Sequence, residues 1–277
     1  MPSSEVRPEL ADVFRLHAPA YLRARSAANG VHSRYLKVIR DVQNCRTPAM
    51  GGHLYQCDTC GARRVAYNSC RNRHCPKCQF LAKEDWIERR KEDLLPVPYF
   101  HIVFTMPADL RPLAFANQSL IYNILFQAAS QSLRDAALNP KNLGARFGAI
   151  AVLHTWGQNL AYHPHLHCVV PGGGIHPDNP AWVASRPNFF ISVRVLSRLF
   201  RGKFLDFLRR AFESGKLVFP GVLSPLATAA AVLTFCQSLR RHNWVVYAKP
   251  PFGGPEQVVA YLGRYTHRIA ISNHRIL

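Results

Sequence analysis

The sequence has 277 residues, 48% of them hydrophobic, and a formal net charge of +19, which excludes a wholly disordered chain and favours a polyanionic partner. Between positions 141 and 277 there are sixteen Lys or Arg and only four acids, so nucleic acid is the leading partner and ribosomal or membrane-surface binding the alternative. The polar start and the shortness of the longest apolar stretch, 227–235, predict a soluble, cytoplasmic protein with no membrane partner and with reduced thiols.

The first part of the chain combines helical patterns with a cysteine-rich block. Residues 12–43 carry a loosely helical pattern, and the cysteines follow between positions 45 and 78. A run of strong helix formers over 80–95 then ends at Pro96 and Pro98. We therefore expect a helical and zinc-binding domain over residues 1–95.

The second part mixes strands and helices without a regular βαβ rhythm. The expected strands are 99–106, 149–156, 165–170, 244–249 and 268–272, and the expected helices are 120–138, 197–215, 227–240 and 256–267. The strands 149–156 and 165–170 are suited to antiparallel pairing, and a Pro-Gly-Gly-Gly run ends the second of them. The sequence therefore predicts an α+β fold, with a largely antiparallel sheet flanked by helices, for a domain over residues 96–277.

The cysteine block contains two Cys-x2-Cys pairs with fourteen residues between them. The pairs are Cys57 with Cys60 and Cys75 with Cys78. Two such turns brought together complete a tetrahedral sulfur site, which is the geometry of structural zinc. The sequence therefore predicts Zn²⁺ on these four thiolates, and the alternative is four buried free thiols.

Further Cys, His and Arg residues lie in the same block. Cys45, His53, Cys70 and His74 could form a second zinc site, or could be small core residues and solvated histidines. Basic side chains, among them Arg71 and Arg73, surround the Cys-x2-Cys turns and are expected to contact DNA phosphates. A zinc ribbon alone does not distinguish a DNA partner from a protein partner.

His165 and His167 are the candidate ligands of a second kind of metal ion. Residues two apart on a strand point to the same face, so both imidazoles can hold one ion while Leu166 enters the core. The preceding strand could supply Gln158 or His154 as the third ligand, and His163 is a weaker candidate because Pro164 kinks the chain. The alternative is a pair of hydrogen-bonded sheet histidines. The scarcity of acids in this half disfavours a carboxylate triad, and with it a carboxylate-type integrase nuclease.

Tyr261 and Tyr265 are four residues apart in the expected last helix, which places both phenols on one face. Arg264, His267 and Arg268 flank them. A phenol attacks a phosphodiester when it can lose its proton and when nearby positive charge stabilises the charge that develops on the phosphate. The alternative is an aromatic stripe that packs against the sheet.

The His-x-His and Tyr-x3-Tyr motifs in one basic chain resemble those of the HUH endonucleases. More closely, the chain is similar to the two-tyrosine rolling-circle transposases of bacterial insertion sequences. The similar stretches are NCRTPAMGGHLYQCDTCG, NSCRNRHCPKCQ, LHTWGQNLAYHPHLHCVVPGGG and YLGRYTHRIAIS. The resemblance implies catalytic metal ligation by His165 and His167 and nucleophilic roles for Tyr261 and Tyr265. We add Gln158 as the third ligand of this metal ion, because the expected hairpin of 149–156 and 165–170 could bring it to the two histidines.

The resemblance also implies a reaction. The protein is expected to cleave and join single-stranded DNA at mobile-element ends through a 5′-phosphotyrosine, with Mg²⁺ or Mn²⁺ at the histidines, DNA contacts from Arg264 and Arg268, and no small-molecule substrate. The alternative is a non-catalytic zinc-ribbon DNA-binding protein, either a regulator or an inactive remnant. Members of the family usually continue past the tyrosine helix, so we expect this chain to be truncated at its C-terminus.

Overall fold

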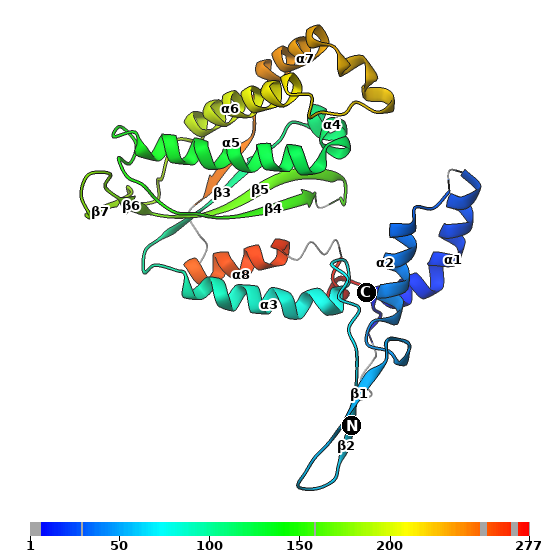
Figure 1. The fold of residues 1–277 in the computed structure, drawn as a ribbon. Coiled ribbons are helices and arrows are strands. Elements are labelled where there is room, and N and C mark those ends of the chain that lie inside the picture. Colours follow the sequence, from blue (N-terminus) through cyan, green and yellow to red (C-terminus); the bar gives the residue numbers. More distant parts are fainter. Residues whose placement is uncertain (1–6, 29, 158, 250–253, 267–270, 277) are drawn as a thin grey trace. The chain divides into compact units, whose positions relative to one another are not determined.

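The structure, a computed structural model, describes residues 7–28, 30–157, 159–249, 254–266 and 271–276 (Figure 1). The chain forms two compact units, which we call the N-terminal unit (Met1–Arg89 with His267–Leu277) and the central unit (Arg90–Thr266). The predicted domain boundary after residue 95 stays a prediction.

The N-terminal unit is built from helices and one hairpin around a very small core. Its elements are α1 (Leu10–Ala28), α2 (Ser33–Asn44), η1 (Pro48–Met50), β1 (Gly52–Gln56), β2 (Arg63–Tyr67), α3 (Pro76–Glu92) and η4 (Asn273–Arg275). The helical pattern over 12–43 is confirmed as α1 and α2, which pack together. The core consists of Ala11, Val42, Cys45 and Cys75. A core of this size contributes little hydrophobic stabilisation, so the unit needs another source of stability.

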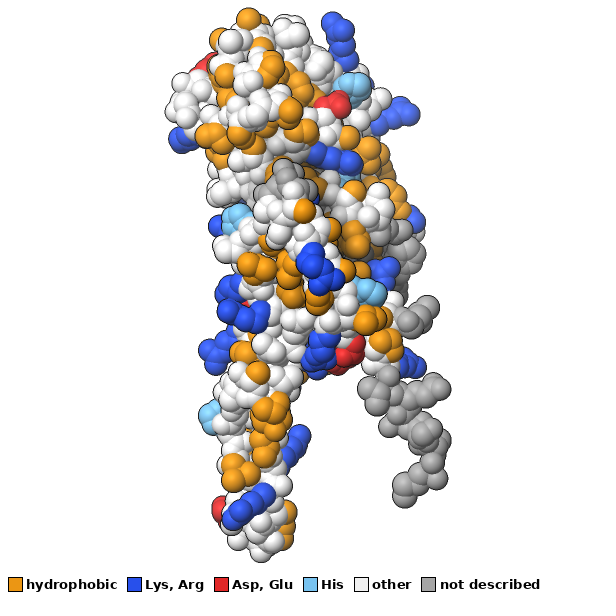
Figure 2. Space-filling model, turned by 90° about the vertical axis from the view of Figure 1, so that its right-hand side faces the viewer, with side chains coloured by type: hydrophobic (Ala, Val, Ile, Leu, Met, Phe, Trp, Pro, Cys, Tyr) orange, Lys and Arg blue, Asp and Glu red, His pale blue; other side chains and the backbone are white. Residues whose placement is uncertain are grey.

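The hairpin β1–β2 extends away from the core of the N-terminal unit. The strands pair antiparallel, with Leu54 opposite Val65 and Gly52 opposite Tyr67, and every residue of both strands is exposed. Apolar side chains of this arm therefore lie at the surface, as Figure 2 shows for the lower part of the molecule.

The central unit contains a four-stranded antiparallel sheet with the strand order β4-β5-β3-β8. The strands are β3 (Tyr99–Thr105), β4 (Ile150–Trp156), β5 (Tyr162–Pro171) and β8 (Val246–Lys249), with a small hairpin of β6 (Gly173–Ile175) and β7 (Trp182–Ala184) beside them. The predicted pairing of 149–156 with 165–170 is the β4–β5 hairpin, in which His154 lies opposite His165 and Val152 opposite His167. The predicted α+β fold with an antiparallel sheet is confirmed.

Helices cover both faces of the sheet (Figure 1). They are α4 (Arg111–Ala116), α5 (Gln118–Leu138), α6 (Val193–Glu213) and α8 (Pro255–Thr266). Helix α7 (Ala229–Arg241) packs on α6 and on the 3-10 turn η3 (Gly221–Ala227), and a further 3-10 turn, η2 (Ala108–Leu110), precedes α4. Alternate strand residues such as Ile102, Phe104 and Leu166 enter the core under α5 and α6. The opposite face carries His101, His165 and His167, and α8 packs against that side on β4, β3 and β5. Because successive strand residues point to opposite faces, the apolar core lies on one face of the sheet and the histidines lie on the other.

Two further observations concern the helices and the chain end. In the part of the chain that the structure describes, no single helix has the length and apolar character to cross a membrane; one bent pair, η3 with α7, meets that test by length and composition alone. Of the strand predicted over 268–272, positions 268–270 lie outside the described residues.

Candidate active site and candidate zinc centre

Three buried histidines gather on the α8 side of the sheet. His154 of β4 and His165 and His167 of β5 have ligand nitrogens within 4.8 Å of one another, and we call them the three-histidine cluster. His154 Nδ1 lies 3.1 Å from His165 Nε2. The register explains the arrangement, because His154 stands directly opposite His165 and His167 is two residues further along the same strand. Three imidazoles at this spacing could hold one metal ion.

The protonation of the two β5 histidines suits metal binding. Burial lowers the pKa of His165, and burial together with the neighbouring imidazoles lowers the pKa of His167 to about 2. These rings are therefore neutral near pH 7, which is the form that ligates metals. His165 Nδ1 donates to the carbonyl oxygen of His163 at 2.6 Å, which assigns Nε2 as the ligand nitrogen.

His101 of β3 extends the cluster toward α8. Its ring stacks on His167 with 5.1 Å between centroids and 8° between planes, and its Nε2 lies 2.9 Å from His167 Nδ1. The ring of Tyr261 meets the ring of His101 in an edge-to-face contact, with centroids 5.7 Å apart and an interplanar angle of 72°. His101 thus connects the three-histidine cluster to a candidate nucleophile.

Helix α8 presents Tyr261 at this site. Val258, Val259 and Leu262 are buried, whereas 40% of Tyr261 is exposed, so its phenol is accessible to a substrate. Tyr265 lies one turn further along α8. The side chains of Tyr265 and Arg264, and the whole of Gln158, His267 and Arg268, lie outside the described residues.

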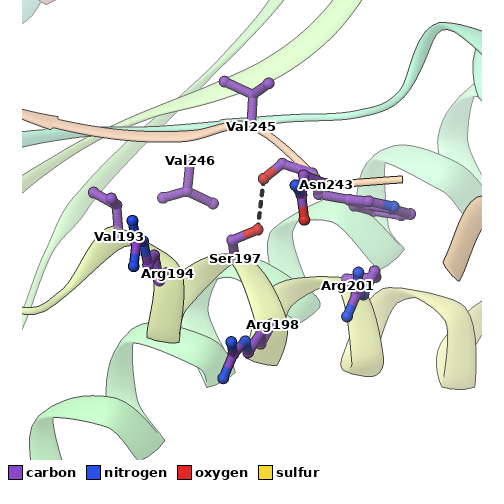
Figure 3. Close-up of a pocket in the computed structure, with 9 residues that line it drawn as sticks. Val193, Arg194, Ser197, Arg198, Arg201, Asn243, Val245 and Val246 are labelled. Atoms are coloured by element: carbon purple, nitrogen blue, oxygen red, sulfur yellow. Dashed lines mark hydrogen bonds between the residues drawn. The ribbon is translucent and has the colours of Figure 1, made fainter. Parts of the chain in front are cut away.

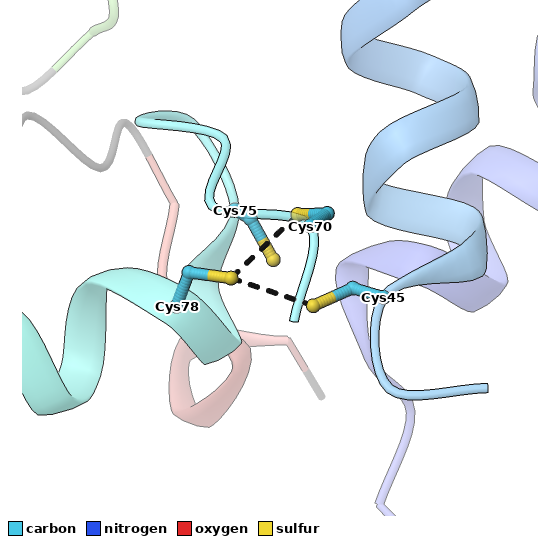
Figure 4. Close-up of side chains that lie close together, drawn as sticks. All are labelled: Cys45, Cys70, Cys75 and Cys78. Atoms are coloured by element: carbon cyan, nitrogen blue, oxygen red, sulfur yellow. Dashed lines mark hydrogen bonds between the residues drawn. The ribbon is translucent and has the colours of Figure 1, made fainter. Parts of the chain in front are cut away.

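A second cluster, of four cysteines, lies in the N-terminal unit (Figure 4). Cys45 at the end of α2, Cys70 after β2, Cys75 before α3 and Cys78 in the first turn of α3 have sulfur atoms within 4.8 Å of one another. Cys78 Sγ lies 3.5 Å from Cys45 Sγ and 3.6 Å from Cys70 Sγ. Four convergent thiols match the donor set of a structural zinc site.

Hydrogen bonds and burial tune these thiols. Burial raises the pKa of Cys75 to about 11 and also raises that of Cys70, whereas hydrogen bonds from the Cys45 and Cys70 thiols outweigh burial and lower the pKa of Cys78. Asn72 supports the loop, since its backbone N–H donates to Cys70 Sγ at 3.5 Å and its Nδ2 donates to the buried Asp41 at 2.9 Å. The loop is therefore preorganised for a metal.

Comparisons with known proteins match both parts of the chain. Residues 148–277 match the family model described as "Putative transposase", of the Y2 kind, and residues 13–106 match the "Transposase zinc-binding domain". The chain is 52% identical to "Putative transposase y4qJ" of Sinorhizobium fredii over 270 residues. The aligned residues make up 98% of this chain and 67% of that protein. The chain belongs to the two-tyrosine transposase family of bacterial insertion sequences.

A more distant relative points the same way. The "Transposase for insertion sequence element IS801" of Pseudomonas savastanoi pv. phaseolicola is 29% identical over 249 residues, which are 89% of this chain and 58% of that protein. The chain thus spans about two thirds or less of the length of these two relatives. Within the family matches, the three-histidine cluster and both tyrosines fall in the transposase segment, and the four cysteines fall in the zinc-binding segment.

The grouping of the zinc-domain cysteines differs from the prediction. Cys57 and Cys60 are exposed in the turn that joins β1 to β2, and they are not in the four-cysteine group that the described residues form. Five-residue strands carry this turn on the order of 16 Å along the hairpin. In the structure Cys75 and Cys78 therefore converge with Cys45 and Cys70, and not with Cys57 and Cys60 as the spacing predicted. Which four thiolates bind zinc stays a prediction.

The predicted second set of zinc ligands is divided as well. Cys45 and Cys70 belong to the four-cysteine cluster, whereas the exposed His53 on β1 and His74 in the loop before α3 do not. Spacing alone could not reveal this grouping, because it depends on how α2 packs against the loop that carries Cys70 and Cys75.

The site of this transposase contains two histidines whose roles the sequence left open or did not indicate. His154 was an alternative to Gln158 as third ligand, and it is His154 that lies in the cluster. His101 was not predicted. The available signal was the alternation in Tyr99–Thr105, where Ile102 and Phe104 enter the core and His101 must face the other way. His163 accepts a hydrogen bond from Arg111 at 2.9 Å and is not a member of the cluster.

Proposed function

We propose that this protein is a transposase that cleaves and joins single-stranded DNA with a tyrosine nucleophile. The observation that carries the proposal is the contact chain from exposed Tyr261 through His101 to the three-histidine cluster. This chain of contacts puts a phenol beside a candidate metal site on one face of the sheet. A phosphodiester bound there would meet both.

The three-histidine cluster fits a divalent cation. Its donors are buried imidazole nitrogen atoms within 4.8 Å of one another, and the lowered pKa values of His165 and His167 keep these two rings neutral. Imidazole is a softer donor than Mg²⁺ prefers, so we expect Mn²⁺ to serve at least as well as Mg²⁺. Such an ion would polarise the scissile phosphate and stabilise the charge that develops on it.

The covalent step is a transesterification at phosphorus. The Tyr261 oxygen forms a bond to the phosphorus atom, the bond from phosphorus to the 3′-oxygen breaks, and the phenolic proton ends on that 3′-oxygen. The products are a 5′-phosphotyrosine and a free 3′-hydroxyl. Because the new ester conserves the phosphodiester bond energy, rejoining needs no ATP. Tyr265, one turn further along α8, would perform the second cleavage, with Arg264 and Arg268 neutralising phosphate charge.

The N-terminal unit would act in recognition. We propose that Cys45, Cys70, Cys75 and Cys78 hold a structural zinc ion, which supplies the stability that the small core cannot. Arg71 and Arg73 are exposed beside this cluster and could contact DNA phosphates at the end of a mobile element. The protein would then work at the bacterial nucleoid.

The experiment traps the covalent intermediate. The full chain is incubated with Mn²⁺ and 3′-labelled single strands that tile the DNA flanking the gene, and the products are separated on a denaturing gel. We expect a labelled protein band that is lost in Y261F/Y265F and kept in Y35F, a control at another exposed tyrosine. Absence of the band in the unaltered protein would favour a non-catalytic zinc-bearing DNA binder.

A further inference from the structure

Three arginines on consecutive turns of α6 line a cavity of about 520 Å³ (Figure 3). Arg194, Arg198 and Arg201 are four and three residues apart, so they lie on one face of the helix. Among the described residues none of the three forms an ion pair, and Arg201 donates only to the carbonyl oxygen of His242, at 3.1 Å. Unpaired guanidinium groups in a cavity are suited to bind an anion.

The cavity continues along the edge of the sheet. A second cavity shares Val193 and Arg194 with the first and is also lined by Phe189 and Lys249. Ser197 Oγ donates to the carbonyl oxygen of Trp244 at 2.6 Å and fixes α6 beside the start of β8 (Figure 3). We call the two cavities together the arginine groove.

Strand β8 links the arginine groove to the face that carries the histidines. Its residues alternate: Val246 packs in the core, whereas Tyr247 and Lys249 are exposed. Lys249 stands directly opposite His101, and Tyr247 stands opposite Val103. Because β8 is the edge strand of the sheet, a ligand on the histidine face can pass over β8 into the groove without crossing another strand of that sheet.

The chemistry of the groove selects a single-stranded nucleic acid. The arginines offer positive charge for successive phosphates, and Phe189, which is 47% exposed, lines the second cavity together with Arg194. Tyr247, which is 43% exposed, lies on β8 on the side of the histidines. A cationic groove with accessible aromatic rings binds single strands, because unpaired bases stack on the rings while phosphates follow the charge. A duplex keeps its bases stacked inside the double helix, so it would gain only the electrostatic attraction of its phosphates to the arginines.

We propose that the arginine groove binds the single-stranded DNA on one side of the scissile phosphate, over β8 and along α6. This inference rests on the proposed function for the identity of the strand. The groove would then hold substrate at a distance from the reacting atoms, so its loss should weaken DNA binding and leave the covalent step intact.

The test measures binding of a fluorescent oligo-dT strand by anisotropy, without added Mn²⁺. The groove variant R194Q/R198Q/R201Q is compared with K141Q/R146Q/K216Q, which removes the same charge from exposed positions outside the groove. We expect the groove variant to bind at least about ten-fold more weakly at 0.1 M salt, with a salt slope smaller by about two. The control variant should bind within about two-fold of the unaltered protein.

Two outcomes would overturn the proposal. Equal weakening in the groove and control variants would mean that only bulk charge matters, and a duplex that competes as well as the single strand would exclude a single-strand site. Should the triple variant fold poorly, R194Q/R198Q answers the same question, because both side chains are exposed. Adduct formation at saturating DNA distinguishes the groove proposal from the proposed function. If the groove variant loses binding and the unaltered protein forms no adduct, the proposed function is wrong and the groove proposal stands.

Discussion

At the residue scale, the three-histidine cluster forms because a third imidazole lies beside His165 and His167 of β5. His154 reaches it because a strand partner directly opposite His165 lies on the same face of the sheet. His101 reaches it from the other side, opposite Val169 and beside His167. Each contribution comes from a neighbouring strand, so no motif within one strand could specify it.

Replacement of His154 tests the third ligand. We expect H154A to lower the affinity for Mn²⁺ by about 10- to 100-fold, because the ion loses one of three imidazole donors while His165 and His167 remain. Isothermal titration calorimetry of the purified chain with Mn²⁺ measures the change. The matched comparison is Q158A, at the position that spacing suggested. A larger loss of affinity in Q158A than in H154A would return the third-ligand role to Gln158.

At the element scale, local patterns predicted most helices and the β4–β5 hairpin. The apolar spacing in 120–138 and 197–215 corresponds to α5 and α6, and alternation in 99–106 corresponds to β3. These signals are local and follow the helix and strand periods. The sequence could not reveal that β8 pairs with β3, or that α8 packs on the histidine face, because those contacts join segments far apart in the chain.

The cysteines also show that spacing along the chain does not reveal which residues meet in the folded protein. Two Cys-x2-Cys turns suggested one zinc site, yet the hairpin β1–β2 carries Cys57 and Cys60 away from the four-cysteine cluster. Cys45 enters that cluster from the end of α2, which spacing within the cysteine block could not show. Residue types were enough to predict a zinc site, whereas the convergence of these particular cysteines depends on tertiary packing.

Zinc content distinguishes the two ligand sets. We expect C45S to lose the zinc ion and to lower the unfolding temperature of the N-terminal unit by at least about 10 °C, because metal binding supplies much of the stability of a unit with so small a core. C57S should keep its zinc. Elemental analysis of the purified variants and thermal unfolding measure both effects. Zinc loss in C57S with retention in C45S would restore the set predicted from spacing.

At the scale of the whole molecule, the net charge of +19 indicated a nucleic-acid partner, and the structure shows where part of that charge can act. The arginine groove reaches one edge of the central unit's sheet, and the three-histidine cluster with Tyr261 lies on the face next to that edge. Charge composition predicted the partner class, but only the fold could show that the arginine groove lies beside β8, the strand that pairs with the β3 strand carrying His101.

The most direct test of a tyrosine nucleophile beside the three-histidine cluster is to map the attached nucleotide. The protein–DNA adduct formed with Mn²⁺ is digested with nuclease and protease, and the modified peptide is sequenced by mass spectrometry. We predict a phosphate-linked nucleotide on Tyr261 or Tyr265 and a free 3′-hydroxyl on the released strand. A nucleotide attached to any other residue, or a released strand that ends in a 3′-phosphate, would contradict the account.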